Sequence, residues 1–316
     1  AGIDLGGTKI QAVVVDDNHE VRGQCRVPTP HDNGPQGVIE AMIGALRSAL
    51  ADAAPSEAAL LGVGVGAPGQ VDPAAGTLSH APNLPDWSGV VQVVAPLHQA
   101  FDTPIHIAND VQAGALGEAR LGAGRDYRSV LGVFCGTGVG GGIVVDGALW
   151  KGRGAAGEIG HIVVEPNGAI CGCGRRGCME AYAGRACMER KARKMHDDGA
   201  KTDLFKIMKS KEKTVLSGGV WAKALAEKDK VARQLIDRAV WALGVGVASA
   251  VNVLDPECVI IAGGLGLRLG QPFVDAVTKS MHPHLLRSDD PPATVLGALG
   301  DLGGAIGATL LVTPQG

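Results

Sequence analysis

The chain has 316 residues, of which 46% are apolar, 3% are aromatic and 48 are glycines, and its formal net charge is −3. A chain of this length and composition predicts a globular protein of two lobes. The small net charge gives no drive toward nucleic acid or an anionic membrane surface. The sequence shows no membrane span and no secretory signal. We therefore expect a cytoplasmic protein that binds small molecules, with no nucleic-acid or membrane partner.

Strand and helix patterns alternate along the first part of the chain. A glycine turn, DLGGTK, separates the first two predicted strands. This alternation is typical of an α/β sheet. The predicted strands are residues 1–5, 10–15, 21–27, 60–66 and 105–108, and the predicted helices are 37–54, 90–101 and 111–121.

A second strand, glycine turn and strand pattern follows about 130 residues after the first. Its turn is GTGVGGG, residues 136–142, between predicted strands 130–135 and 142–145. The repeat indicates two related lobes that each present a backbone loop to one ligand. Two ordinary hairpins are the alternative. Farther along the chain we expect a basic, solvated helical stretch at 190–213, a long helix at 230–254, a strand at 258–262 and a last helix at 302–311.

The two glycine turns suit phosphate groups, because glycine lets backbone N–H groups approach an anion closely. Phosphoryl transfer depends mainly on positioning and on neutralising charge, so two phosphate loops and a carboxylate for hydrated Mg²⁺ form a consistent set. Asp4, at the end of the first strand, is the candidate carboxylate. The pattern predicts phosphoryl transfer.

A kinase that acts on an alcohol needs a carboxylate beside the attacking hydroxyl. In IANDV, Asp110 follows a predicted strand and opens a helix. Functional side chains of open α/β sheets gather at this edge. Asp110 is therefore the candidate general base, and a plain helix cap is the alternative.

Three cysteines are crowded into CGCGRRGC, and GEIGH lies just before them. A closed zinc site needs four ligands, and His161 is the nearest suitable fourth ligand to Cys171, Cys173 and Cys178. Four protein ligands leave no position for water, so the predicted zinc is structural. The pattern also fits a reducing compartment better than a disulfide framework.

Zinc on one nitrogen of His161 would place the proton on the other nitrogen and fix that edge as a hydrogen-bond donor. Glu158 and Glu180 flank the zinc ligands in sequence. Their carboxylates are candidate acceptors for sugar hydroxyls, because sugars are discriminated by buried hydrogen bonds.

Taken together, these motifs resemble the ROK family (repressors, open reading frames and sugar kinases) along nearly the whole chain. The motifs stand in the family's order. The most specific of them is the cysteine-rich segment CGCGRRGC, residues 171–178, called the zinc knot below. The motifs are DLGGTK, GAPG, PNLPDW, NDV, GTGVGGG, GEIGH and CGCGRRGCME.

The resemblance implies a two-lobed α/β fold of the actin and hexokinase kind, which is ribonuclease H-like, with a duplicated phosphate-loop device and an inserted zinc knot. We expect a small lobe at 1–112, completed by the C-terminal helix at about 300–316, and a large lobe at 113–299 with the zinc site and the nucleotide-binding region. The implied ligands are ATP with Mg²⁺, structural Zn²⁺ and a hexose between the lobes.

The resemblance also assigns residues to roles. Asp110 is the implied catalytic base, and zinc is implied on His161, Cys171, Cys173 and Cys178. The implied sugar contacts are Asn83, Asp110, Glu158, His161 and Glu180. In GAPG, Gly66 is a further candidate because glycine lets the backbone approach the sugar, and an ordinary turn at the end of a strand is the alternative. The implied nucleotide contacts are Asp4, Gly6, Gly7, Thr8, Lys9, Gly136, Thr137 and Gly138, with adenine near Gly263 and Gly264.

Within the family, the motifs look most similar to those of bacterial glucokinases, which form glucose 6-phosphate in glycolysis. An N-acetylhexosamine or fructose kinase is an alternative, as is the sugar-sensing domain of a repressor, which would require a DNA-binding module ahead of residue 1. Polyphosphate is an alternative donor that the basic stretch 190–213 would attract. The resemblance favours a homo-oligomer, a dimer or tetramer.

Overall fold

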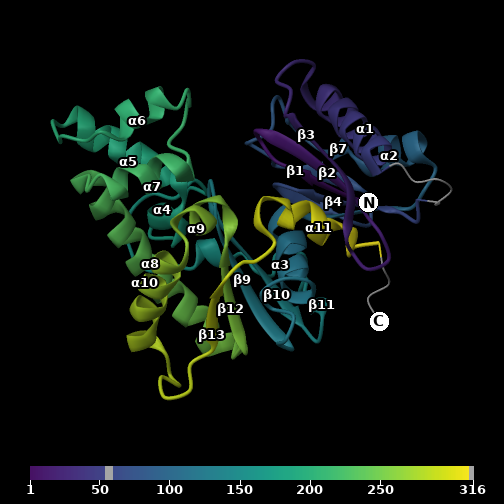
Figure 1. Ribbon diagram of the computed structural model, residues 1–316. Coiled ribbons are helices and arrows are strands. Elements are labelled where there is room, and N and C mark those ends of the chain that lie inside the picture. Colours follow the sequence, from purple (N-terminus) through teal and green to yellow (C-terminus); the bar gives the residue numbers. More distant parts are fainter. Residues whose placement is uncertain (54–59, 313–316) are drawn as a thin grey trace. The chain divides into compact units, whose positions relative to one another are not determined.

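The computed structural model describes residues 1–53 and 60–312 (Figure 1). The last residue of the helix predicted at 37–54, and the end of the C-terminal segment predicted to reach residue 316, lie outside the described residues. The strands are β1 Gly2–Leu5, β2 Lys9–Val15, β3 Val21–Pro28, β4 Val63–Ala67, β5 Gln70–Asp72, β6 Thr77–Ser79, β7 Val91–Gln92, β8 Ile105–Asn109, β9 Ser129–Cys135, β10 Val139–Val145, β11 Ala148–Leu149, β12 Cys258–Ala262 and β13 Ala293–Leu296. The α-helices are α1 Gly34–Ala53, α2 Val94–Phe101, α3 Asp110–Arg120, α4 Glu180–Ala183, α5 Arg185–Asp197, α6 Leu204–Ser210, α7 Gly218–Ala226, α8 Lys230–Leu254, α9 Gly263–Leu269, α10 Gln271–Met281 and α11 Gly303–Thr309.

The chain divides into two compact units. Unit 1 consists of Ala1–Arg125, Gly142–Ala156 and Ala298–Gly316, and unit 2 consists of Asp126–Gly141 and Gly157–Gly297. Unit 1 therefore combines both ends of the chain with a segment from its middle. The lobe boundaries expected near residues 112 and 299 stay a prediction.

Two five-stranded sheets have the same strand order relative to their glycine turns. The first runs β3-β2-β1-β4-β8 and the second runs β11-β10-β9-β12-β13. In each sheet the strand before the turn has the strand after the turn on one side and parallel strands on the other, as β1 pairs with β4 and β9 pairs with β12. The repeat of the strand, turn and strand pattern in the sequence therefore corresponds to a repeat of sheet topology.

Within unit 1, successive side chains of β1 point to opposite faces of the sheet. Ile3 and Leu5 are fully buried in a core that includes Val38 and Met42 of α1. Asp4 points the other way and lies against the start of α11, where a Cβ added to Gly304 would be 2.9 Å from the Asp4 carboxyl carbon. The alternation thus separates the apolar core from a carboxylate at the end of the strand.

Helix α11 packs very closely on β4 and α3. A Cβ added to Gly64 would lie 1.7 Å from the Ala308 carbonyl oxygen, and one added to Gly307 would lie 2.0 Å from the carbonyl oxygen of Ala113. No larger residue fits at either position without moving backbone. These glycines fix α11 beside the strand edge that carries Asp4.

Glu118 of α3 is a buried carboxylate, only 3% exposed, that fastens the segment leading to α11. It accepts hydrogen bonds from the backbone amides of Ala123, Ala298 and Leu299 at 2.9–3.1 Å. Ala298 lies 180 residues after Glu118 in the sequence. The Glu118 side chain therefore holds the C-terminal segment of unit 1 in place.

Glu118→Leu is expected to lower the free energy of unfolding by about 3 kcal/mol, because it removes the buried charged acceptor of three backbone amides. Chemical denaturation of the purified variant measures this loss. Glu40→Leu is the matched control, since Glu40 of α1 is exposed and its side chain accepts from the Gln36 side chain one turn away, and its effect should stay within about 0.5 kcal/mol. Equal stabilities for the two variants would contradict the anchoring role of Glu118.

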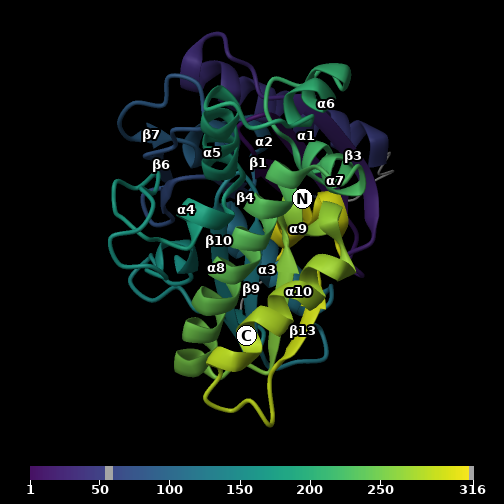
Figure 2. The same ribbon diagram turned by 90° about the vertical axis from the view of Figure 1, so that its left-hand side faces the viewer.

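In unit 2, α10 packs on β13 and α8 packs beside α10 (Figure 2). Among the described helices, α8 is the one that is long and apolar enough to cross a membrane, with a mean hydropathy of 1.2. However, 56% of its apolar window is buried inside the structure, as is common for a core helix of a folded domain. Its small residues serve this packing: a Cβ on Gly244 would lie 2.3 Å from the hydroxyl oxygen of Ser280 in α10.

Most predicted elements differ from the structure at one end or both; the strand predicted at 142–145, for example, begins at Val139, inside the predicted glycine turn. The helix predicted at 90–101 begins only at Val94, because residues 91–92 pair with β6 as a short strand. The strand predicted at 60–66 is β4, shifted toward the C-terminus. The basic stretch 190–213 consists of the end of α5 and the whole of α6, separated by a connection.

Candidate functional site

Asp4, Gly66 and Asp110 lie at one edge of the first sheet. Strands β1, β4 and β8 are parallel neighbours, and their register pairs Asp4 with Gly66 and Gly66 with Ala108. Asp110 follows the end of β8 directly. Two strand spacings of about 4.8 Å separate β1 from β8, so the two aspartates lie roughly 10 Å apart along this edge. Carboxyl ends of parallel strands are where α/β sheets bind ligands.

The helix cap of α3 is Asn109 and not Asp110. The Asn109 side chain accepts hydrogen bonds from the amides of Val111 and Gln112 at 3.0 and 3.3 Å. Asp110 is the first helical residue, and one of its carboxylate oxygens accepts from the Val111 amide at 2.9 Å. Because Asn109 supplies the cap, the alternative that Asp110 serves only as a cap loses its main support.

Gly66 gives Asp110 the space it occupies. A Cβ at Gly66 would lie 3.3 Å from the Asp110 Cα and 3.4 Å from the Ala113 Cβ. That separation is tighter than most contacts of a real Cβ, so a side chain at residue 66 would press on the start of α3. The sequence predicted that Gly66 contacts the sugar, and the structure places it beside the candidate base.

The first glycine turn lies against the segment that carries Asn83. The Gly6 amide donates to the Lys9 carbonyl at 2.9 Å, which closes the turn between β1 and β2. A Cβ added to Gly7 would be 2.5 Å from the Asn83 carbonyl oxygen. Thr8, at the tip of the turn, is exposed. The structure therefore brings together the predicted phosphate loop and one predicted sugar contact within unit 1.

Burial raises the pKa of Asp4, while the nearby Lys9 ammonium opposes this shift. Burial also lowers the pKa of Lys9, and the Arg26 charge adds to that effect. An additional cation beside Asp4 would favour its ionised form. Hydrated Mg²⁺ typically binds one or two carboxylate oxygens and keeps several of its waters. Asp4, next to the glycine turn, could supply such an oxygen.

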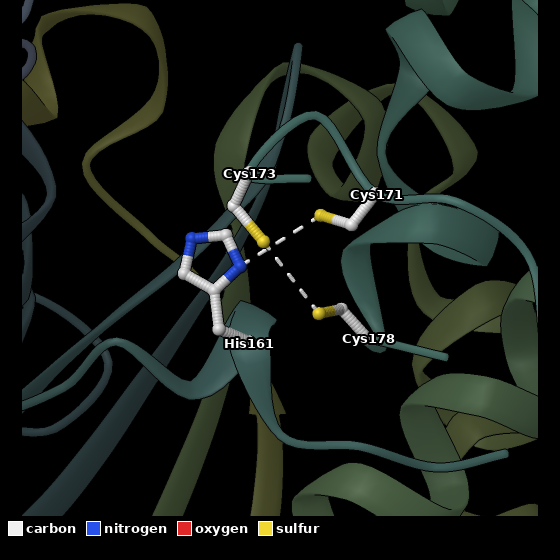
Figure 3. Close-up of side chains that lie close together, drawn as sticks. All are labelled: His161, Cys171, Cys173 and Cys178. Carbon is white, nitrogen blue, oxygen red and sulfur yellow. Dashed lines mark hydrogen bonds between the residues drawn. The ribbon is translucent and has the colours of Figure 1, made fainter. Parts of the chain in front are cut away.

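In unit 2, the four predicted zinc ligands come together (Figure 3). The Cys171 Sγ lies 3.8 Å from the His161 Nδ1, the Cys173 Sγ lies 3.8 Å from the Cys178 Sγ, and all four candidate ligand atoms lie within 4.8 Å of one another. Zinc bonds of about 2.0–2.3 Å in a tetrahedron hold their ligand atoms about 3.5–3.8 Å apart. The cluster therefore fits a zinc ion with little adjustment, and Nδ1 is the histidine nitrogen that faces it.

Backbone turns shape the knot that carries the cysteines. The Cys171 amide donates to the Arg175 carbonyl at 2.8 Å. Gly177, with φ of +79°, passes so close to the chain that a Cβ would lie 1.8 Å from the Glu165 carbonyl oxygen. Cys171 and Cys178 are buried and Cys173 is exposed. The knot thus has one ligand at the surface and two beneath it.

Two cysteines elsewhere in the chain do not resemble metal ligands or nucleophiles. Burial raises the pKa of Cys135 to about 12 and that of Cys258 to about 11. A thiol with so high a pKa remains protonated at neutral pH and unreactive. Both cysteines occupy strands of the second sheet, where they serve packing.

Glu158, His161 and Glu180 have different surroundings. The His161 Nε2 lies 3.8 Å from a carboxylate oxygen of Glu158, too far for a hydrogen bond. One oxygen of Glu180 accepts from the Val139 amide at 3.0 Å, and the other lies 3.3 Å from the Cys171 Sγ. Glu180 therefore touches both the zinc cluster and the strand that follows the second glycine turn.

The second glycine turn, Gly136 to Gly138, is closed by a hydrogen bond from the Gly136 amide to the Gly138 carbonyl at 2.9 Å. Gly263 lies against the strand that enters this turn, since its Cβ would be 2.6 Å from the Cys135 carbonyl oxygen. A Cβ on Gly264 would meet no atom within 4 Å. The predicted phosphate loop and the predicted adenine region are thus neighbours within unit 2.

The structure adds a residue at this turn that the sequence analysis missed. Arg185 donates from a terminal guanidinium nitrogen to the Thr137 hydroxyl at 3.1 Å. An arginine 48 residues away in sequence gives no local signal of this contact, because only the fold of unit 2 brings the start of α5 to the turn.

Residues 1–315 match the ROK family. The chain belongs to the ROK family. It is 34% identical to a glucokinase of Thermotoga maritima over 84% of this chain and 81% of that protein. It is also 34% identical to an N-acetylmannosamine kinase of Haemophilus influenzae over 85% of this chain and 81% of that protein. The crystal structure of a ROK glucokinase from Streptomyces griseus, in complex with glucose and AMPPNP, has a TM-score of 0.82 and 32% identity, covering 98% of this chain and 97% of that one.

These similarities confirm the mixed α/β, hexokinase-like fold that the sequence predicted. The family membership also explains why the motifs occur in a fixed order along the whole chain. The chain is equally identical, at 34%, to kinases that are named for two different sugars.

Proposed function

We propose that this ROK sugar kinase transfers the γ-phosphoryl group of ATP to the 6-hydroxyl of a hexose, with glucose as the preferred substrate and glucose 6-phosphate as the product. The observation that carries the proposal is the position of Asp110. Its carboxylate lies at the carboxyl edge of a parallel sheet, beside Gly66, while Asn109 supplies the helix cap. A carboxylate at this position is suited to accept a proton.

In the proposed reaction, Asp110 accepts the proton of the attacking hydroxyl as its oxygen bonds to the γ-phosphorus of ATP, while the bond from that phosphorus to the β,γ-bridging oxygen breaks and ADP leaves. Asp4 would hold Mg²⁺ and its waters, and a bound magnesium ion would neutralise charge on the phosphates. Asp110 directly follows β8 and Asp4 lies near the end of β1, and these two strands are separated by two strand spacings of about 4.8 Å. The phosphate-binding amides come from residues Gly6, Gly7, Thr8 and Lys9 and from Gly136, Thr137 and Gly138.

The proposed sugar contacts are Asn83 and Gly66 in unit 1 and Glu158, His161 and Glu180 in unit 2. With zinc on its Nδ1, His161 keeps a proton on Nε2, which then donates to a sugar oxygen. The proposed zinc is structural, because four protein ligands complete its tetrahedron. Its role is to orient His161 and the loop around it.

The substrate assignment is tested with glucose, mannose, fructose, N-acetylglucosamine and N-acetylmannosamine, each with ATP and Mg²⁺, by measuring kcat/KM. We expect glucose to have the highest value. A higher value for an N-acetylhexosamine would remove glucose as the preferred substrate and leave the kinase activity in place. No phosphorylation of any of the five sugars would contradict the proposed function as a whole.

ATP is the proposed donor, and polyphosphate is expected to give no turnover even at low salt. In the basic stretch 190–213, Arg193 pairs with Glu189 and Lys194 pairs with Asp198, so part of its charge is already neutralised. An extended polyanion binds through unneutralised charge and shows a strong salt dependence. Turnover with polyphosphate that falls steeply as salt increases would contradict this expectation.

We also propose that the protein works in the cytoplasm as a dimer or tetramer. All seven cysteines are free thiols in the structure, which suits a reducing compartment. Sedimentation of the purified protein tests the oligomeric state.

A further inference from the structure

The first turn of α5 is bonded to the second glycine turn through its backbone. The amide of Arg185 donates to the Gly136 carbonyl at 3.2 Å, and the amide of Ala186 donates to the Thr137 carbonyl at 3.0 Å. These bonds use the carbonyl side of the turn. In the part of the chain that the structure describes, the amides of Thr137 and Gly138 have no hydrogen-bond acceptor. The turn therefore presents two N–H groups to a ligand.

The side chain of Arg185 lies at the same turn with part of its hydrogen-bonding capacity unused. One terminal nitrogen donates to the Thr137 hydroxyl at 3.1 Å. The Nε is buried and has no partner among the described residues. Within those residues the guanidinium forms no ion pair, because the carboxylate of Glu189, one turn along α5, is held by Arg193 and by the Leu216 amide.

An arginine in this situation requires an explanation. Burial lowers the pKa of Arg185, with the Glu189 charge opposing the shift, so the charged guanidinium is partly removed from water. A partly buried charge is ordinarily paired, and an unsatisfied buried donor is costly. Guanidinium groups match the oxygens of phosphate well, because their donors are planar and point in fixed directions.

We propose that the Arg185 guanidinium binds a phosphate group of the nucleoside triphosphate donor, next to the free amides of Thr137 and Gly138. The arginine neutralises phosphate charge at the second glycine turn, where the turn itself supplies only neutral amides. This inference rests on the proposed ATP-dependent kinase function and adds a residue to its nucleotide site.

The test compares the affinities of AMP-PNP, which has three phosphate groups, and adenosine, which has none, for the wild-type protein and for Arg185→Gln. A charge-assisted hydrogen bond to phosphate is worth about 10- to 100-fold in affinity, so AMP-PNP binding should weaken by this factor while adenosine binding stays within about twofold. Arg185→Lys should lose less, because it keeps the positive charge without the planar donors. Lys191→Gln is the matched control, because Lys191 is an exposed cation on the same helix, and it should leave AMP-PNP affinity unchanged.

Unchanged AMP-PNP affinity in Arg185→Gln would overturn the inference. An equal loss of AMP-PNP and adenosine binding would also overturn it, because it would show that Arg185 only supports the shape of the turn. If the wild-type protein bound AMP-PNP but phosphorylated no sugar, the proposed kinase function would fail while the phosphate contact of Arg185 survived. The two ideas are therefore tested separately.

Discussion

Asp110→Asn is expected to lower kcat for glucose phosphorylation by about 10²- to 10⁴-fold, the usual contribution of a positioned general base. Asparagine has nearly the same shape and can still hydrogen-bond a sugar hydroxyl, but it cannot accept the proton. Glucose affinity, measured by calorimetry, should therefore stay within a few fold. Steady-state kinetics with ATP and Mg²⁺ measure kcat.

Two controls separate chemistry from folding in this experiment. Asp237→Asn changes an exposed aspartate of α8 and should leave kcat unchanged. Asn109→Ala removes the observed helix cap and should lower the free energy of unfolding by about 1 kcal/mol, with a much smaller loss of kcat than Asp110→Asn. Near-normal turnover in Asp110→Asn would remove Asp110 from the proposed mechanism.

Cys173→Ala is expected to remove zinc and to weaken glucose binding by about 10- to 100-fold, the range for losing a group that orients a ligand-binding residue. Cys173 is the exposed ligand of the cluster, so its replacement leaves no cavity in the core. Without zinc, His161 loses its fixed ring orientation, and the loop that leads to Glu180 is less restrained. Nucleotide affinity should change less. The zinc-bearing loop contacts β10, the strand after the second glycine turn, through one hydrogen bond, which Glu180 accepts from the Val139 amide.

Zinc content, glucose affinity and AMP-PNP affinity are measured on the folded variant, with circular dichroism to confirm the fold. Cys25→Ala, in β3 of unit 1, is the control for cysteine replacement and should keep both zinc and glucose affinity. Unchanged glucose affinity in a zinc-free, folded Cys173→Ala protein would show that the zinc site stabilises only its own loop. It would also show that His161 needs no metal for its orientation.

Much of the fold could be predicted from the sequence, because local patterns determine it. The glycine turns between β-rich segments, and the alternation of Ile3, Asp4 and Leu5 in β1, are local signals that survive in the structure. The spacing of Cys171, Cys173 and Cys178 confined the fourth ligand to a nearby residue, and the structure brings the His161 Nδ1 to them. The prediction of Asp110 as the general base rests on its position directly after a strand, which the structure shows.

Contacts between distant segments were not accessible to the same reasoning. The bond from Arg185 to Thr137 and the bonds from Glu118 to residues 298 and 299 depend on how whole elements pack. The start of α2 also depends on a contact with a distant segment, because residues 91–92 pair with β6 as a strand and the helix begins only at Val94. The sequence also could not tell that Asn109 rather than Asp110 caps α3, since both residue types are good caps.

The proposed function requires that the protein phosphorylates a hexose with ATP at the 6-hydroxyl. The most direct test incubates the purified protein with glucose, ATP and Mg²⁺, and identifies the product by phosphorus and proton NMR. We predict stoichiometric ADP and a phosphate ester on carbon 6 of glucose, with product forming at least about 100-fold more slowly when Asp110→Asn replaces the wild-type protein. ATP consumption without a sugar phosphate, or a phosphate at another position of the sugar, would contradict the claim.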